Sequence, residues 1–398
     1  MIEVVNIEAL DAIVGRIFAF NQRNLGNEKQ RFVLQYYGQL LDPDSARAYD
    51  QLSSEVSSFN LIPRFFEEGG KQVINLERPL PISKPFNPRI NLIFFILTLI
   101  SVLIAGGLFS FEGNLPSDLL QAISVLMMNG WPFALSLLAI LAAHEFGHYF
   151  AGKRNNVQVT LPYFIPMPFS AFGTLGAFIN MRSYPKNKKA LFDLSITGPL
   201  CGFAVSVIVL VIGLKLSTLN VLPSAPAANA SIQMEGNSLI YLLLKYLVFG
   251  KLLPSPHQLS GIPLFIYWGQ YFFTGQPFPW GSLDVMLHPV AWAGWAGLFI
   301  TGINLLPAGQ LDGGHIFASA FGVQNARRLF PYILVAMVLM GFFWETWWIW
   351  AVLIFLMGRF YAEPLDQITP LDKKRKWLGW LAIVLFVITF IPVPLMII

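Results

Sequence analysis

Long apolar runs separated by short polar segments make up most of the chain after residue 89. A helix needs about 20 apolar residues to cross a bilayer. Five runs near that length and one close pair of shorter runs predict seven spans. The five are Ile90–Ser110, Pro132–Gly152, Ala190–Leu214, Pro289–Leu306 and Trp377–Ile398, and the pair is Leu329–Phe343 and Thr346–Gly358. Two shorter stretches, Ser238–Gly250 and Gly261–Phe273, contain Lys, Pro or Gly and predict interfacial helices or partial insertions.

The first 82 residues have the shorter periodicities of a soluble unit. They predict a helix near 7–20, a helix near 43–57, a strand at Arg31–Gln39 and a hairpin from Leu61–Phe66 and Gln72–Leu76. A Pro-rich segment then leads into the first span. The predicted fold is therefore an α-helical polytopic membrane protein, residues 86–398, preceded by a small soluble α/β domain, residues 1–85. This domain has no recognisable catalytic set, so a regulatory or substrate-docking role stands beside that of a plain folding unit.

The segment Val157–Ser183 lies between two predicted spans and does not have the pattern of a helix. It is rich in Pro, Gly and β-forming residues, and it has no charge before Arg182. Apolar non-helical backbone beside a membrane is tolerated where protein or a water-filled cavity satisfies its amides. We therefore predict a strand-like re-entrant hairpin, and the alternative is a loop lying among the lipid headgroups.

Composition and charge agree with a membrane protein and suggest its orientation. Of the 398 residues 55% are hydrophobic and 12% are charged, and the mean hydropathy is +0.58. Lys and Arg concentrate in 153–189, 327–328 and 359–376, so the positive-inside rule makes these loops and the N-terminal domain cytoplasmic. The acidic N-terminus lacks the pattern of a cleaved leader. It therefore favours a bacterial cytoplasmic or thylakoid membrane. Contact with lipid headgroups rather than nucleic acid is expected.

The second predicted span contains His144-Glu145-Phe146-Gly147-His148, which is unusual in an apolar helix. Histidines four residues apart leave the same face of a helix and can bind one metal ion, while Glu145 can act as general base on a metal-bound water. One ionised residue at mid-bilayer costs about 2.5–3.5 kcal/mol on insertion scales, so a polar group without a role is disfavoured here. The pattern predicts a zinc site. The single cysteine, Cys201, excludes a thiolate cluster.

Two histidines and a water leave one position of a tetrahedral zinc site for a third protein ligand. His257, His288 and Glu345 are predicted on the opposite side of the membrane, and Asp193 fits the start of a helix. Asp312 remains, because it follows the fourth span at the depth of His144 and His148, where Pro307 and several glycines predict a broken helix. The alternative for Asp312 is a helix cap, and nearby His315 fits either a partner of the site or an interfacial histidine.

Together, HEFGH and "NLLPAGQLDGG", Asn304–Gly314, resemble the site-2 protease family of intramembrane zinc metalloproteases. The second motif, "SITGPLCGF" at 195–203, the preceding soluble domain and "PLDQITPLDKKRK" at 364–376 resemble its EGY-type branch in cyanobacteria and plastids. The resemblance implies zinc held by His144, His148 and Asp312, Glu145 as general base, and Asn304 near the substrate carbonyl. It also implies that the 157–183 hairpin presents the substrate as an extended strand. The family's Gly-Asn-Leu-Arg stretch is represented only by Arg23-Asn24-Leu25-Gly26.

The predicted function is hydrolysis of peptide bonds within or near transmembrane segments of membrane-protein substrates. Two rival functions are a non-catalytic membrane chaperone or scaffold, which would not need Glu145, and a metal or ion transporter, which also uses intramembrane His and Asp beside a broken helix.

Overall fold

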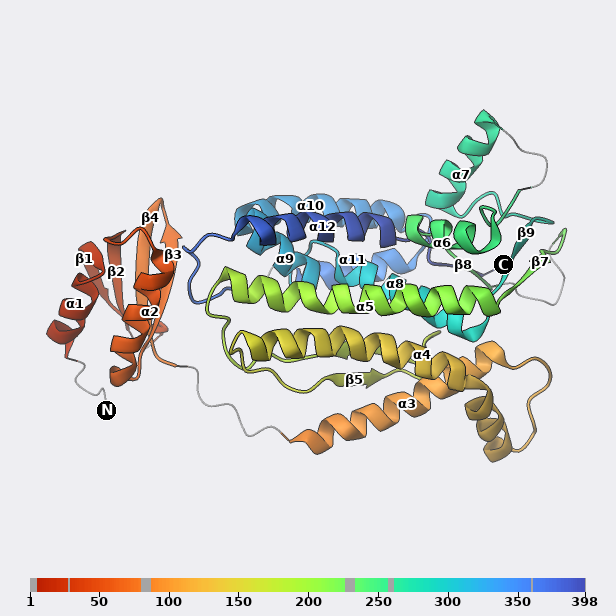
Figure 1. Cartoon of the computed structure of the whole chain (residues 1–398), viewed down its shortest axis with the longest axis horizontal. Helices are drawn as coiled ribbons and strands as arrows, with labels where there is room; N and C mark the ends of the chain where they lie inside the picture. The colour runs from red at the N-terminus through yellow and green to blue at the C-terminus, as the bar shows by residue number, and fades with distance from the viewer. Residues whose placement is uncertain are drawn as a thin grey trace.

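The computed structural model describes residues 6–27, 29–79, 87–225, 233–256, 261–358 and 361–397. It has an N-terminal α/β part beside a larger helical part (Figure 1). Most of the predicted Pro-rich linker, and His257, lie outside the described residues.

The N-terminal part is a four-stranded antiparallel sheet with two helices. The strand order is β1-β2-β4-β3. Its elements are α1 (Ile7–Gly15), β1 (Phe18–Leu25), β2 (Phe32–Leu40), α2 (Ser45–Val56), the 3-10 turn Ser57–Phe59, β3 (Ile62–Glu68) and β4 (Lys71–Glu77). The helices bury one face on the sheet, with Leu10 and Leu52 packed against Leu34 and Ile74.

One sequence prediction for this part is wrong. The helix predicted near 7–20 ends at Gly15, and Phe18–Leu25 is an edge strand instead. Polar residues occupy most of this strand after Phe20. The side chains of Asn21, Gln22 and Arg23 are exposed, and β1 is an edge strand paired only with β2 in the described sheet. The period-2 signal was therefore too weak to distinguish β1 from the end of a helix.

Helices occupy all seven positions predicted as spans: α3 (Pro88–Ser110), α4 (Leu119–Arg154), α5 (Lys188–Leu216), α8 (Pro289–Asn304), α10 (Val323–Met340), α11 (Thr346–Met357) and α12 (Lys373–Thr389). Within the described residues, α3, α4 and α5 are long and apolar enough to cross a membrane. The count of seven spans stays a prediction. The shorter stretches form α6 (Leu239–Phe249) and α7 (Ile262–Thr274).

Two of these helices have different limits from those predicted. α4 begins 13 residues before Pro132, which lies inside it. α12 ends at Thr389, so the prediction that it continues to Ile398 is wrong. Pro392 and Pro394 follow closely and cannot donate the backbone hydrogen bonds that a longer helix needs. The chain then forms the short strand β10 (Leu395–Ile397), which pairs with β8 (Gln233–Glu235).

The predicted hairpin is present as β5 (Tyr163–Pro166) and β6 (Thr174–Phe178), which pair antiparallel beside α3 and α4. A second small sheet joins β7 (Thr218–Val221) to β9 (Leu283–Met286). The helices α4, α5 and α8 pack side by side (Figure 1). Glycines allow their backbones to approach closely, because a Cβ on Gly213 of α5 would lie 2.1 Å from the backbone nitrogen of Ala291 in α8.

A segment that sequence analysis did not place joins the two parts. Residues 363–369, here called the tether, run beside β3 of the N-terminal sheet. The Phe65 N–H donates to the Leu365 carbonyl and the Gln367 N–H to the Phe65 carbonyl, each at 2.8 Å. On its other side the tether reaches the loop before α5, where the Asp366 N–H donates to the Lys186 carbonyl at 2.8 Å. The N-terminal sheet is thereby held at the start of α5.

Candidate metal centre

The two histidines of the HEFGH motif lie on one face of α4. Their side chains are buried, each residue being 4% exposed, and their ring centroids lie 4.8 Å apart. The Nε2 atoms of His144 and His148 are separated by 3.1 Å. Both rings therefore direct one nitrogen toward the same point, as their i, i+4 spacing predicts.

Asp312 is the first residue of α9 (Asp312–Phe321), which begins after a break at the end of α8. Gly309 has a φ of +50°, a left-handed conformation that favours glycine. A Cβ on Gly313 would lie 2.0 Å from the Leu305 carbonyl oxygen, so the turn folds back against α8 with no room for a larger residue. This compact turn directs the Asp312 carboxylate at the histidines of α4.

The three side chains have the spacing of a tetrahedral metal site. Asp312 Oδ2 lies 3.2 Å from Nε2 of His144 and 3.2 Å from Nε2 of His148. Ligands at 2.0–2.1 Å from a tetrahedral zinc ion lie about 3.3 Å from one another. Within the described chain, His144, His148 and Asp312 form the group whose ligand atoms lie close enough to one another to hold one metal ion. The structure therefore brings together the three predicted ligands, and the residues present fit a zinc ion.

Helix α5 forms the wall behind both imidazoles. The Nδ1–H of His148 donates to the Leu194 carbonyl at 2.7 Å, which leaves Nε2 of that ring free as a ligand. A Cβ on Gly198 would lie 2.1 Å from Nε2 of His148, and one on Gly202 would lie 2.9 Å from Nδ1 of His144. Sequence analysis did not assign this role to the glycines. Their i, i+4 spacing on a span was the signal that could have revealed it.

Glu145 is also buried, at 4% exposure, and it lies next to the hairpin. Its carboxylate is hydrogen-bonded to the backbone of Ile179, the residue after β6. The other oxygen, Oε2, has no hydrogen-bond partner within the described part of the chain. A buried carboxylate oxygen without a partner is costly. This atom is therefore available to accept a proton from a water in the site.

The structure also locates the other polar residues that the sequence analysis considered for the site. Asn304, at the end of α8, has its Nδ2 3.4 Å from Nε2 of His144, so it borders the centre. His315 is buried one turn after Asp312. Asp193 pairs with Arg375 of α12 at 2.5 Å, and His288 caps α8. Neither of these two belongs to the ligand group.

Comparisons with known proteins agree with this arrangement. The family model described as "Peptidase family M50" matches residues 132–343, which contain all three predicted ligands. The chain is 30% identical over 286 residues to "Probable zinc metalloprotease EGY2, chloroplastic" of Arabidopsis thaliana, covering 70% of this chain and 45% of that protein. It is also 30% identical over 266 residues to EGY1 of the same plant, covering 66% and 43%. A rice EGY1 protein is 27% identical over 321 residues, covering 76% and 50%.

The chain matches at most half the length of these three relatives. The family model nevertheless covers more than half of this chain, including both motifs. The resemblance stated from the two motifs is therefore confirmed. The chain belongs to peptidase family M50, the site-2 proteases, in the branch of the EGY-type proteins.

Proposed function

We propose that this chain is an intramembrane zinc metalloprotease that hydrolyses peptide bonds within or near transmembrane segments of other membrane proteins. The observation that carries the proposal is that Nε2 of His144, Nε2 of His148 and Oδ2 of Asp312 lie 3.1–3.2 Å from one another. Glu145, on the same helix as the two histidines, has a carboxylate oxygen without a partner in the described chain. The printed names of the relatives, zinc metalloproteases, support the same metal and reaction.

Each residue then has a distinct task. His144, His148 and Asp312 would hold the zinc ion, which when bound acidifies a water molecule to a pKa near 7 and polarises a carbonyl. Glu145 accepts the proton of the attacking water and later delivers it to the amine of the departing chain. The Asn304 amide lies close enough to His144 to orient a substrate carbonyl at the centre.

The hairpin provides the means of presenting a substrate. A transmembrane helix bonds its own amides and protects them, so a stretch of the substrate must unwind before cleavage. In the described chain β6 pairs with β5 alone, and Leu175 and Phe178 on β6 are 66% and 48% exposed. An extended peptide can add to such a strand. Because Ile179, directly after β6, contacts Glu145, a peptide paired with β6 would lead to the catalytic base.

We also propose the orientation and location of the protein. The N-terminal domain, taken as residues 1–85, and the ends of α4 and α12 that carry Lys153 and Lys373 face the cytoplasm or an equivalent compartment, as the positive-inside rule requires. The printed names of the relatives describe chloroplast proteins. A bacterial cytoplasmic or thylakoid membrane is therefore the proposed location.

The decisive experiment replaces Glu145 by Gln and measures zinc content and cleavage of a single-span reporter in the same preparation. A general base contributes about 10²- to 10⁴-fold to a rate, so cleavage should fall by at least 100-fold while zinc binding is kept. Glu345→Gln, an exposed change at the start of α11, is the matched control and should cleave normally.

Two results would contradict the proposal. Cleavage of the reporter by Glu145→Gln at the wild-type rate would exclude Glu145 as the general base. Zinc transport into sealed vesicles that depends on His144 but not on Glu145 would instead establish the rival function of a transporter.

A further inference from the structure

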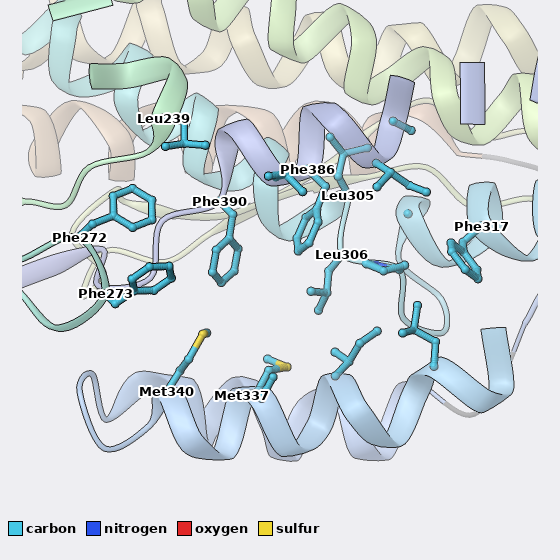
Figure 2. A pocket seen from close by; sticks show the side chains of 18 of the residues that line it. Leu239, Phe272, Phe273, Leu305, Leu306, Phe317, Met337, Met340, Phe386 and Phe390 are labelled. Atoms are coloured by element: carbon cyan, nitrogen blue, oxygen red, sulfur yellow. The ribbon is translucent and has the colours of Figure 1, made fainter. Parts of the chain in front are cut away.

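A large apolar cavity lies on the side of the helical part formed by α10, α11 and α12. Its volume is about 890 Å³. Figure 2 shows Met337 and Met340 of α10 facing Leu306, Phe386 and Phe390 across it. Apolar side chains and glycines line it throughout, including residues of α6 and α7 at its far end. The described chain therefore has a chamber suited to hydrocarbon.

Positive charges stand at one end of this cavity. On α12, Lys376 lies one turn before Gly379, which lines the cavity, and the i, i+3 spacing places both on the same face. On α10, Arg328 directly precedes Leu329, another lining residue. Both cationic residues are exposed, and no ion pair is formed by either one within the described ranges. A ligand with an apolar body and an anionic end would complement this arrangement.

The volume of the cavity can be compared with the volumes of hydrocarbon chains and of a protein helix. A dry cavity of about 150 Å³ binds one benzene molecule, so about 890 Å³ accommodates on the order of 30 carbon atoms. A 20-residue helix, about 30 Å long and at least 10 Å wide, occupies more than about 2,000 Å³. The space therefore matches the acyl chains of one lipid, whereas a whole transmembrane helix would extend beyond it.

We propose that the cavity is a binding site for one anionic phospholipid. Its acyl chains lie between α10 and α12, and its phosphate is bound by Arg328 and Lys376. The wall of the cavity includes Leu305, Leu306 and Pro307 of the turn between Asn304 and Asp312, and Gly313, which follows Asp312 in α9. A bound lipid therefore packs against the turn that carries the third metal ligand. The site does not depend on peptidase activity, and it is tested without a substrate.

The test measures lipid binding to the purified full chain by native mass spectrometry, with phosphatidylglycerol and phosphatidylcholine of the same acyl chains. One phosphatidylglycerol per chain should remain bound at concentrations where phosphatidylcholine dissociates. Each cationic side chain near an anionic headgroup contributes about 1 kcal/mol, so Arg328→Gln with Lys376→Gln should weaken phosphatidylglycerol binding about 30-fold. Phosphatidylcholine binding should change little.

Lys153→Gln with Arg154→Gln is the matched control, because it removes two cations from the end of α4, outside the cavity lining. It should leave lipid binding unchanged. Ala336→Phe places a ring into the cavity from α10 and should displace both lipids. Zinc content of each variant verifies that it is folded. Equal binding of the two lipids, an equal loss in the control, or retention of phosphatidylglycerol by folded Ala336→Phe would each overturn the proposal.

Discussion

Substitution of Gly198 by Ala tests whether α5 positions the metal ligands. The added Cβ would lie 2.1 Å from Nε2 of His148, well inside ordinary van der Waals contact, so the ring must move by roughly 1 Å. Metal ligands tolerate errors of about 0.2 Å, and losing a partner that orients a ligand costs about 10- to 100-fold in affinity. Since the movement also strains the Nδ1 hydrogen bond to Leu194, we expect zinc affinity to fall by at least 100-fold.

The effect on folding should be much smaller. Overpacking costs about 1–3 kcal/mol, and the replacement of glycine by alanine inside a helix returns about 1 kcal/mol. Zinc affinity, measured by competition with a chelator, should therefore change far more than thermal stability. Gly202→Ala, with its closest contact at 2.9 Å, should show an intermediate loss, and Ala204→Val, on an exposed position of α5, should bind zinc normally. Wild-type zinc affinity in Gly198→Ala would refute the positioning role of α5.

Further predictions concern the third ligand, the tether and a buried carboxyl group. Asp312→Asn should lower zinc affinity in the chelator assay by more than about 100-fold, because a charged ligand is lost; near-normal affinity would exclude Asp312 as a ligand. Asp366→Ala removes the carboxylate that accepts from the backbone and the hydroxyl of Thr369, at about 0.5–1.5 kcal/mol per bond, and should speed limited proteolysis between the two parts. The control Glu8→Ala, an exposed change in α1, should not speed it. Burial raises the pKa of Glu235 to about 7, so the folded chain retains a proton that the unfolded chain loses near pH 4.5. Stability should fall as pH rises between these values, and Glu235→Gln should flatten the thermal-unfolding profile; an unchanged profile would contradict this.

The grouping of His144, His148 and Asp312 was predictable from sequence because each of the two motifs carries a strong local signal. The i, i+4 spacing of His144 and His148 fixes their common face, and the break after α8 places Asp312 at the start of α9. The positions of the main helices were also predictable, because apolar runs of that length have few alternatives near a membrane. These features depend on short stretches of sequence that each carry a strong signal.

Other features depend on contacts between distant residues and were missed for that reason. The tether has no pattern of its own, since its strand-like backbone exists only where β3 and the loop before α5 provide hydrogen-bond partners. The carbonyl of Leu194 carries no side-chain signal at all, yet it sets which nitrogen of His148 is free. The helix predicted near 7–20 overlapped the first three residues of edge strand β1, and the exposed polar residues that follow, Asn21, Gln22 and Arg23, gave no strand signal.

The same helix, α5, meets both the tether and the metal centre, and its packing shows how far the two are coupled. Its start lies beside the tether, and its middle contacts both imidazoles. Backbone-level contacts hold it between its neighbours, since a Cβ on Gly147 of α4 would lie 2.9 Å from the Thr197 carbonyl oxygen and one on Gly213 would lie 2.1 Å from Ala291. Close-packed backbones of this kind leave no room for gradual displacement. Release of the N-terminal domain should therefore leave α5, and with it the zinc affinity, unchanged.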